Sequence, residues 1–131
     1  MKRLDNLDYD SLITNLLSNG HISAHVLVGS RLGYNFVVSK LVDKLEGFEE
    51  VSIHRNTGAF RNIEIGSILS VSCYHDYDDV IQSTCGRVLD CIYIDHEPAA
   101  YTENYLSSRI RRPMSLPNIA GIVGITIFKG V

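Results

Sequence analysis

The sequence lacks most of the features that would set it apart from an ordinary globular protein. It has no apolar run long enough to cross a membrane, and the N-terminal stretch MKRLDNLDYD lacks the apolar segment of a signal peptide. Its three cysteines are an odd number at irregular spacing, which is not the pattern of a disulfide framework. Cys73 and Cys91 fall in apolar, strand-like runs, where buried and inert thiols are expected. We therefore expect a protein of the reducing cytoplasm, in the host cell if the chain is viral, with no membrane contact.

The sequence also lacks a large excess of positive or negative charge. The 131 residues carry a formal net charge of −3, with 45% hydrophobic and 21% charged residues, which suits one domain with a real hydrophobic core. A negative net charge gives no general attraction to nucleic acid, so such a contact would need a local basic patch. The segment SRIRRP supplies one basic cluster, Arg109, Arg111 and Arg112. A solvated surface is the simpler explanation of this cluster, and contact with nucleic acid or an acidic partner is the alternative.

The spacing of apolar residues predicts strands that alternate with helices along the chain. Helices are expected over about 9–17, from the glycine turn near 29 to about 45, over 77–82 as a short helix or loop, and around 101–110. Strands are expected over 22–28, 51–53, 63–73, 88–94 and 119–128, with a polar loop around 56–58 and a candidate hairpin turn at 66–67. This alternation favours one α/β domain over 1–131, with a mostly parallel central sheet flanked by helices and with 1–20 as an N-terminal helical segment.

The first candidate site is the stretch HVLVGSRLGYNF, where a predicted strand meets a glycine turn and a predicted helix. Backbone N–H groups of such a turn and of the helix N-terminus bind phosphate in P-loop proteins. That motif requires Lys and then Ser or Thr after its second glycine, and here Tyr34 and Asn35 stand in those places. The candidate nucleotide-binding residues are Gly29, Ser30, Arg31, Gly33, Tyr34 and Asn35. Arg31 is the only cation among them, and the alternative is that both glycines serve only the backbone turn.

The second candidate site follows the apolar strand in CIYIDHE. Asp95 stands where a Walker B strand places the acid that binds Mg²⁺, so it is the candidate metal ligand. His96 and Glu97 are the further catalytic candidates, with His96 in the place of the acid that polarises the attacking water. The alternative is that Asp95 caps the following helix. Both candidate sites lie at carboxyl ends of predicted strands, where α/β sheets bind their ligands.

Four motifs, taken in order, resemble those of a known family. They are SRLGYNFVVSKLV, GSILSVSCYHD, TCGRVLDCIYIDHEPAAY and GIVGITIFKG. In this order they resemble the ATPase domain of large terminases, the DNA-packaging motors of tailed phages. The resemblance extends over about 25–130 and implies a P-loop-like, three-layer fold without the nuclease domain. It also implies that the three chemical positions most needed for hydrolysis have become Tyr34, Asn35 and His96.

We therefore expect a small phage-type pseudo-ATPase rather than an enzyme. It would act by binding a protein partner, from the packaging machinery or the host, or by binding a nucleotide, with ATP and Mg²⁺ as the cofactors in question. A second hypothesis is an active but unconventional NTPase, in which Arg31 or a neighbouring subunit's arginine such as Arg111 replaces the lysine and Glu97 activates water. A third is a nucleic-acid-binding module that uses the arginine cluster.

Overall fold

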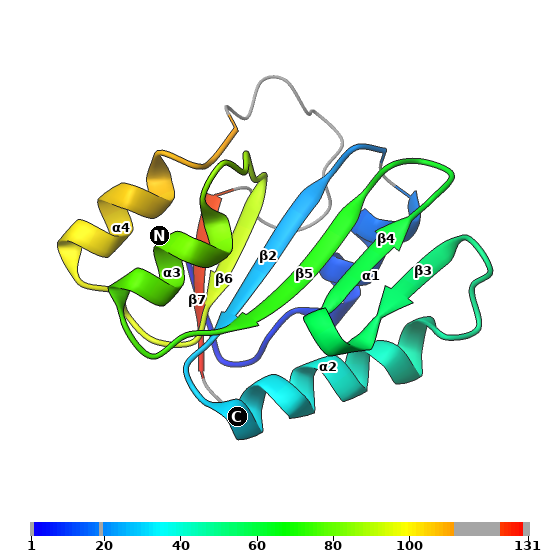
Figure 1. The fold of residues 1–131 in the computed structure, drawn as a ribbon, viewed down its shortest axis with the longest axis horizontal. Coiled ribbons are helices and arrows are strands. Elements are labelled where there is room, and N and C mark those ends of the chain that lie inside the picture. The colour runs from blue at the N-terminus through cyan, green and yellow to red at the C-terminus, as the bar shows by residue number, and fades with distance from the viewer. Residues whose placement is uncertain (1, 19, 112–123, 130–131) are drawn as a thin grey trace.

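The structure, a computed structural model, describes residues 2–18, 20–111 and 124–129 as an α/β domain (Figure 1). The helices are α1 (Tyr9–Ser18), α2 (Arg31–Leu45), α3 (Tyr77–Thr84) and α4 (Ala100–Ser107), and a 3₁₀ turn covers Arg55–Thr57. The strands are β1 (Lys2–Leu4), β2 (Ser23–Val28), β3 (Val51–His54), β4 (Ala59–Asn62), β5 (Ile68–Cys73), β6 (Cys91–Ile94) and β7 (Gly124–Phe128).

These strands form one sheet in the order β1-β7-β6-β2-β5-β4-β3. The first five in this order pair in parallel, whereas β4 and β3 are joined to β5 by antiparallel pairing at one side of the sheet. The carboxyl ends of the five parallel strands therefore meet at a common edge, which we call the carboxyl edge. β2 lies on this edge between β6 and β5.

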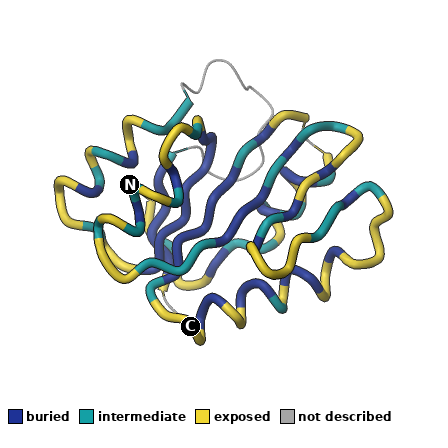
Figure 2. The backbone as a smooth tube through the Cα atoms, in the orientation of Figure 1, coloured by how far each residue is buried: buried dark blue, intermediate teal, exposed yellow. Residues whose placement is uncertain are grey.

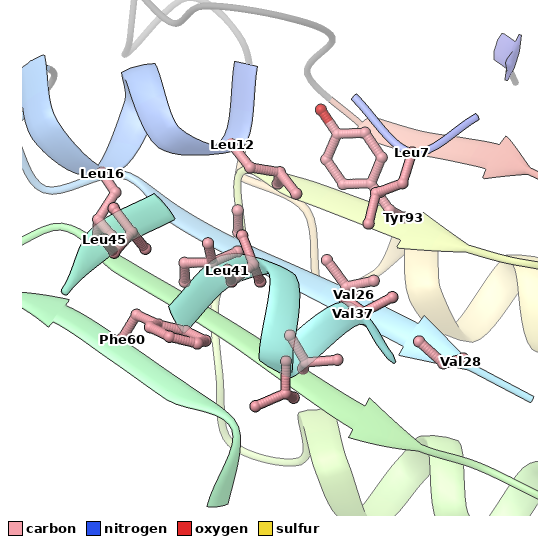
Figure 3. Packing of buried hydrophobic residues seen from close by; sticks show 14 of the residues in the cluster. Leu7, Leu12, Leu16, Val26, Val28, Val37, Leu41, Leu45, Phe60 and Tyr93 are labelled. Atoms are coloured by element: carbon pink, nitrogen blue, oxygen red, sulfur yellow. The ribbon is translucent and has the colours of Figure 1, made fainter. Parts of the chain in front are cut away.

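Helices cover both faces of the sheet, which gives three layers. On one face Leu12 of α1 and Leu41 of α2 pack with Val26 of β2 (Figure 3). On the other face Val80 of α3 and Leu106 of α4 belong to the cluster that contains Leu27. Successive residues of a strand point to opposite faces, so β2 needs apolar residues throughout to be covered on both sides. The central strands are accordingly the most buried part of the chain (Figure 2).

The predicted α/β class with a mostly parallel sheet and flanking helices is confirmed, but the strand expected before the 66–67 turn was misplaced. That strand is β4, which ends at Asn62, one residue before the expected start at 63, and follows the loop around 56–58 directly, whereas β5 follows the turn as expected. Gly66 has a φ of +76°, and a Cβ there would lie 2.8 Å from the His21 ring, so this turn requires glycine. The N-terminal segment 1–20 is not purely helical, because β1 precedes α1 and pairs with β7. The expected strand residues 119–123 lie outside the described residues.

Membrane insertion through a helix has no support in the described part of the chain. None of its helices combines the length and the apolar character needed to cross a bilayer.

Candidate functional site

On both sides of β2, the connections that leave the carboxyl edge switch from one face of the sheet to the other. The chain leaves β2 into α2 on one face, whereas the flanking strands β6 and β5 lead to α4 and α3 on the other face. Such reversals open crevices beyond the strand ends, and these crevices are the usual ligand sites of open α/β sheets. Both candidate sites from the sequence therefore lie in the part of the fold best placed to bind a ligand.

The turn after β2 is only two residues long, Gly29 and Ser30, because α2 begins at Arg31. Ser30 is the N-cap of α2, and its hydroxyl accepts a hydrogen bond from the Gly33 N–H at 3.0 Å. Gly33 and Tyr34 are buried in the first turn of the helix, while Asn35 beside them is exposed. Four of the six predicted nucleotide-binding residues thus belong to a regular helix rather than to a loop.

Asp95 lies at the end of β6 and binds the glycine turn directly. Its carboxylate is 5% exposed and accepts the Gly29 N–H at Oδ2 (2.7 Å) and the Tyr74 hydroxyl at Oδ1 (3.0 Å). Burial, the charge of Asp95 and this hydrogen bond together raise the pKa of Tyr74, so the phenol remains a donor. We call Gly29, Tyr74 and Asp95 the Asp95 latch. The alternative role as a helix cap does not apply to Asp95, because α4 begins at Ala100 with Ala99 as its N-cap.

His96 and Glu97 line a cleft of about 460 Å³ at the ends of β1, β6 and β7. The imidazole of His96 is 68% exposed, and its Nε2 lies 3.8 Å from Oδ1 of Asp95. The second hypothesis assigns Glu97 to activating water. Its carboxylate forms an exposed ion pair with Arg3. Arg3 comes from β1, a strand that the sequence did not predict. The sequence therefore gave no signal that this arginine would reach the site.

Arg31 and Tyr34 line a second cleft, of about 370 Å³, on the other side of β2. The Arg31 guanidinium lies 5.0 Å from the centre of the Tyr34 ring, a cation–π contact that directs the cation along α2. The rest of the lining consists of the carboxylate of Asp79, apolar or thiol side chains and uncharged polar groups, from Val71, Cys73, Asn56, Thr57, Ser72, Gln82 and Ser83. The residues predicted to act together at one nucleotide are thus divided between two clefts, with Arg31 and Tyr34 in one and Asp95, His96 and Glu97 in the other.

The candidate metal ligand Asp95 is a hydrogen-bonded carboxylate that also lines the cleft of about 460 Å³. Each of its oxygens already accepts a hydrogen bond, and the residue is buried. Among the residues that the structure describes, no three His, Cys, Asp or Glu side chains gather as a metal site would require.

The predicted arginine cluster lies at the other end of the sheet. Arg111 forms an ion pair with the buried Asp90, with 3.4 Å between Nε and Oδ1, and Asp90 also accepts the backbone N–H of Ser23, the first residue of β2, at 2.8 Å. Arg109 lies 5.4 Å above the Tyr105 ring. Arg112 is outside the described residues. Two of the three arginines thus contact their own domain, and Arg111 lies far along β2 from the Asp95 latch.

Sequence reasoning missed a buried polar cluster, His25, Ser70 and Arg87, on the α3–α4 face of the sheet. His25 is fully buried, with Nδ1 2.6 Å from the Ser70 hydroxyl and 3.2 Å from Nη1 of Arg87. Burial and the positive charge of Arg87 lower the pKa of His25 to about 3, so the ring is neutral at pH 7. The available signal was a polar residue inside an otherwise apolar central strand, which must find a hydrogen-bond partner.

The cysteine predictions hold at Cys91, which is fully buried in β6. Burial, with the charge of Asp90, raises its pKa to about 12, so the thiol is inert at neutral pH. Cys73 is only partly buried at the end of β5, and burial raises its pKa as well.

Comparison with known proteins adds no assignment to this geometry. No protein-family model matches the sequence, and no curated protein matches it either.

Proposed function

We propose that this chain is a non-hydrolysing binding domain with a degenerate P-loop-like architecture, and that its ligand is a protein. The observation that carries the proposal is the Asp95 latch. Oδ2 of Asp95 lies 2.7 Å from the Gly29 nitrogen, where a P-loop would direct its first backbone N–H toward phosphate. The chain's own buried carboxylate thus fills an anion position of the turn.

A nucleotide has little to bind at this turn. Its phosphate would have to displace Asp95 from two hydrogen bonds or approach a buried negative charge, and both are unfavourable. The Gly33 N–H is also engaged, by the Ser30 hydroxyl. A phosphate loop presents several free N–H groups at once, whereas here one N–H of the turn and one of the first turn of α2 are engaged by side chains of the protein.

Hydrolysis lacks its remaining groups as well. Arg31 packs on Tyr34 in one cleft, and Glu97 pairs with Arg3 in the other, so neither faces a common substrate position. Phosphoryl transfer depends on cations and a positioned base that act together on one γ-phosphate. Losing both is worth several kcal/mol of barrier, since about 1.4 kcal/mol corresponds to a tenfold change in rate.

A protein-binding surface lies beside the carboxyl edge, on the first two turns of α2. Leu32 is 80% exposed and Phe36, one turn later, is 51% exposed. Arg31 and Lys40 flank this pair, and the Lys40 ammonium lies 5.8 Å from the centre of the Phe36 ring. Exposed apolar side chains between cations fit a partner segment that carries apolar and acidic residues. The resemblance to large terminases makes a packaging protein the partner to test first.

The nucleotide part of the proposal is tested by calorimetry and by phosphate release with millimolar ATP and Mg²⁺. We expect neither binding nor turnover. Asp95→Asn is the informative variant, because it removes the charge and keeps an oxygen that can accept the Gly29 N–H. ATP turnover by the wild-type protein that is lost in Asp95→Ala would overturn the proposal.

The partner part is tested with purified packaging proteins and the double variant Leu32→Ser/Phe36→Ser. We expect the wild-type chain to co-elute with one of them and the double variant to lose at least tenfold in affinity. Val88→Ser is the matched control, since Val88 is 58% exposed but lies outside α2. Equal binding by the double variant and the wild type would exclude this surface.

A further inference from the structure

The outer side of β3 is an open strand edge. β3 is the last strand of the sheet, and among the described residues it pairs only with β4. The Ile63 N–H donates to the Glu50 carbonyl, and the antiparallel register pairs residue 51 with 62, 52 with 61 and so on. In an antiparallel ladder every second residue faces the partner strand, so Ser52 and His54 face β4.

Val51 and Ile53 therefore direct their backbone groups away from β4, toward solvent. The Val51 N–H is engaged by the Phe48 carbonyl at 3.1 Å. This leaves the Val51 carbonyl and both backbone groups of Ile53 facing outward. An uncovered row of this kind is a template for another strand.

The charges along this edge are arranged with opposite signs at its two ends. Glu49 and Glu50 lie in the turn just before β3, the strand itself runs from Val51 to His54, and Arg55 begins the 3₁₀ turn that follows. Arg55 donates to the neutral hydroxyl of Ser39, and no ion pair within the described residues involves Glu49, Glu50 or Arg55. A strand that runs antiparallel with the same sequence would place its basic end against this acidic end.

In one register the Ile53 N–H of each copy donates to the Val51 carbonyl of the other, and the oppositely charged ends of the strands meet. The Ile53 carbonyl gains no partner there, because the Val51 N–H is already engaged by Phe48. With Ser52 opposite Ser52 of the second copy, Val51 lies opposite Ile53, and these are the residues whose backbone groups face outward. Glu49 and Glu50, in the turn before β3, then lie at the same end of the pair as His54 and Arg55 of the second copy. Centring the pair on Ile53 would move Glu49 away from Arg55, and centring it on Val51 would place Glu49 opposite Ile53.

We propose that two copies of this chain associate through their β3 edges, antiparallel and about a two-fold axis at Ser52, so that the sheet continues from one protomer into the other. The same patch then serves both partners, as two-fold symmetry requires. The contact area of two four-residue strands is small, so the dimer is weak and depends on concentration. This inference goes beyond the proposed function and does not depend on it.

Sedimentation over a range of concentrations tests the pairing, with charge reversal as the discriminating perturbation. Glu49→Arg and Arg55→Glu each place like charges at both ends of the pair, and we expect each to weaken the dimer at least tenfold. The double variant restores opposite charges across the axis and recovers dimerisation. A double variant as weak as the single variants overturns the proposed register. A wild-type chain that stays monomeric at about 1 mM overturns self-association and leaves the edge to a strand of another protein.

Two further variants separate the edge from the fold. Ile53→Pro removes an outward N–H that β4 does not use, so the protein should remain folded and become monomeric. Ser52→Cys, in a Cys85→Ser background, should form a disulfide across the axis, because directly opposite residues bring their Cβ atoms about 5 Å apart. Arg61→Cys in the same background is the control, since Arg61 is exposed on the adjacent strand but not at the edge. Equal cross-linking of the two cysteine variants contradicts the proposal.

Discussion

His25 links the stability of the domain to pH, and the structure gives both the sign and the size of the effect. The side chain is fully buried, and its Nδ1 faces the Ser70 hydroxyl and the Arg87 guanidinium. Arg87 also donates to the Ser70 oxygen at 2.8 Å, which directs the serine proton toward Nδ1. A second proton on the ring would therefore meet a donor and a positive charge in an apolar surrounding, and folding must exclude it.

The folded state lowers the pKa of His25 to about 3, from 6.5 in the unfolded chain. Between these values the unfolded state binds the extra proton, so the free energy of unfolding falls as the pH falls below 6.5. From pH 7.5 to pH 5 the loss from this residue is about 2 kcal/mol, and by pH 4 it is about 3 kcal/mol. Total stabilities of about 5–15 kcal/mol make this loss easy to measure.

The assay is urea unfolding at several pH values, with the variant His25→Gln measured beside the wild type. Glutamine keeps an acceptor oxygen for the serine and arginine donors but does not titrate. The other four histidines are present in both proteins, so the difference between the two pH profiles isolates His25. We expect the variant to be less stable at pH 7.5 and to lose about 2 kcal/mol less than the wild type on going to pH 5. Parallel profiles would refute the reasoning.

Two further predictions concern a glycine with a positive φ and a buried carboxylate that is paired with an arginine. Gly58→Ala places a Cβ 2.6 Å from a β5 carbonyl at a φ of +63° and should cost about 2 kcal/mol or more in urea unfolding. Gly29→Ala should cost less, because its Cβ would lie 3.0 Å from the exposed His96 ring and 3.2 Å from Oδ1 of Asp95, with no positive φ. Arg111→Met leaves the carboxylate of Asp90 buried without its cation and should cost about 1–3 kcal/mol, reduced from the fully buried case because the arginine is 36% exposed. Adding Asp90→Asn should recover part of the loss. Equal costs for the two alanine variants, or no recovery in the double variant, would contradict these accounts.

The elements that the sequence predicted correctly are those that bury a repeating apolar pattern. β2, β6 and α2 have such patterns, and the structure has them close to the predicted bounds. β1 could not be predicted because its three residues are charged or partly exposed, and it becomes a strand only through pairing with β7. β4 presents only Phe60 and Asn62 to the interior, which is too short for a periodic signal.

In the candidate site, too, the sequence predicted local features and missed long-range contacts. The position of Asp95 at a strand end is a local property, and the sequence indicated it. Its bond to Gly29 and the pairing of Arg3 with Glu97 join residues 66 and 94 positions apart, and one sequence alone carries no sign of such contacts. Ser30 is an exception, because its role as a helix cap could have been predicted from the sequence. A serine directly before a helical pattern is a common N-cap, and this would have placed the helix start at Arg31.

The length of the turn after β2 determines what a strand-end acid can do here. A loop of several residues would lift its N–H groups away from the sheet and leave an anion-sized space between the loop and Asp95. The two-residue turn instead holds the Gly29 N–H at the strand end, and the carboxylate of the neighbouring strand reaches it at 2.7 Å. With a longer loop the strand-end acid would be free to bind a metal ion, whereas with the two-residue turn it accepts a hydrogen bond from the backbone. The same reasoning predicts that a longer turn engineered between Val28 and Arg31, together with lysine in place of Tyr34, would be needed before nucleotide binding could appear. Lysine alone would leave Asp95 in the anion position.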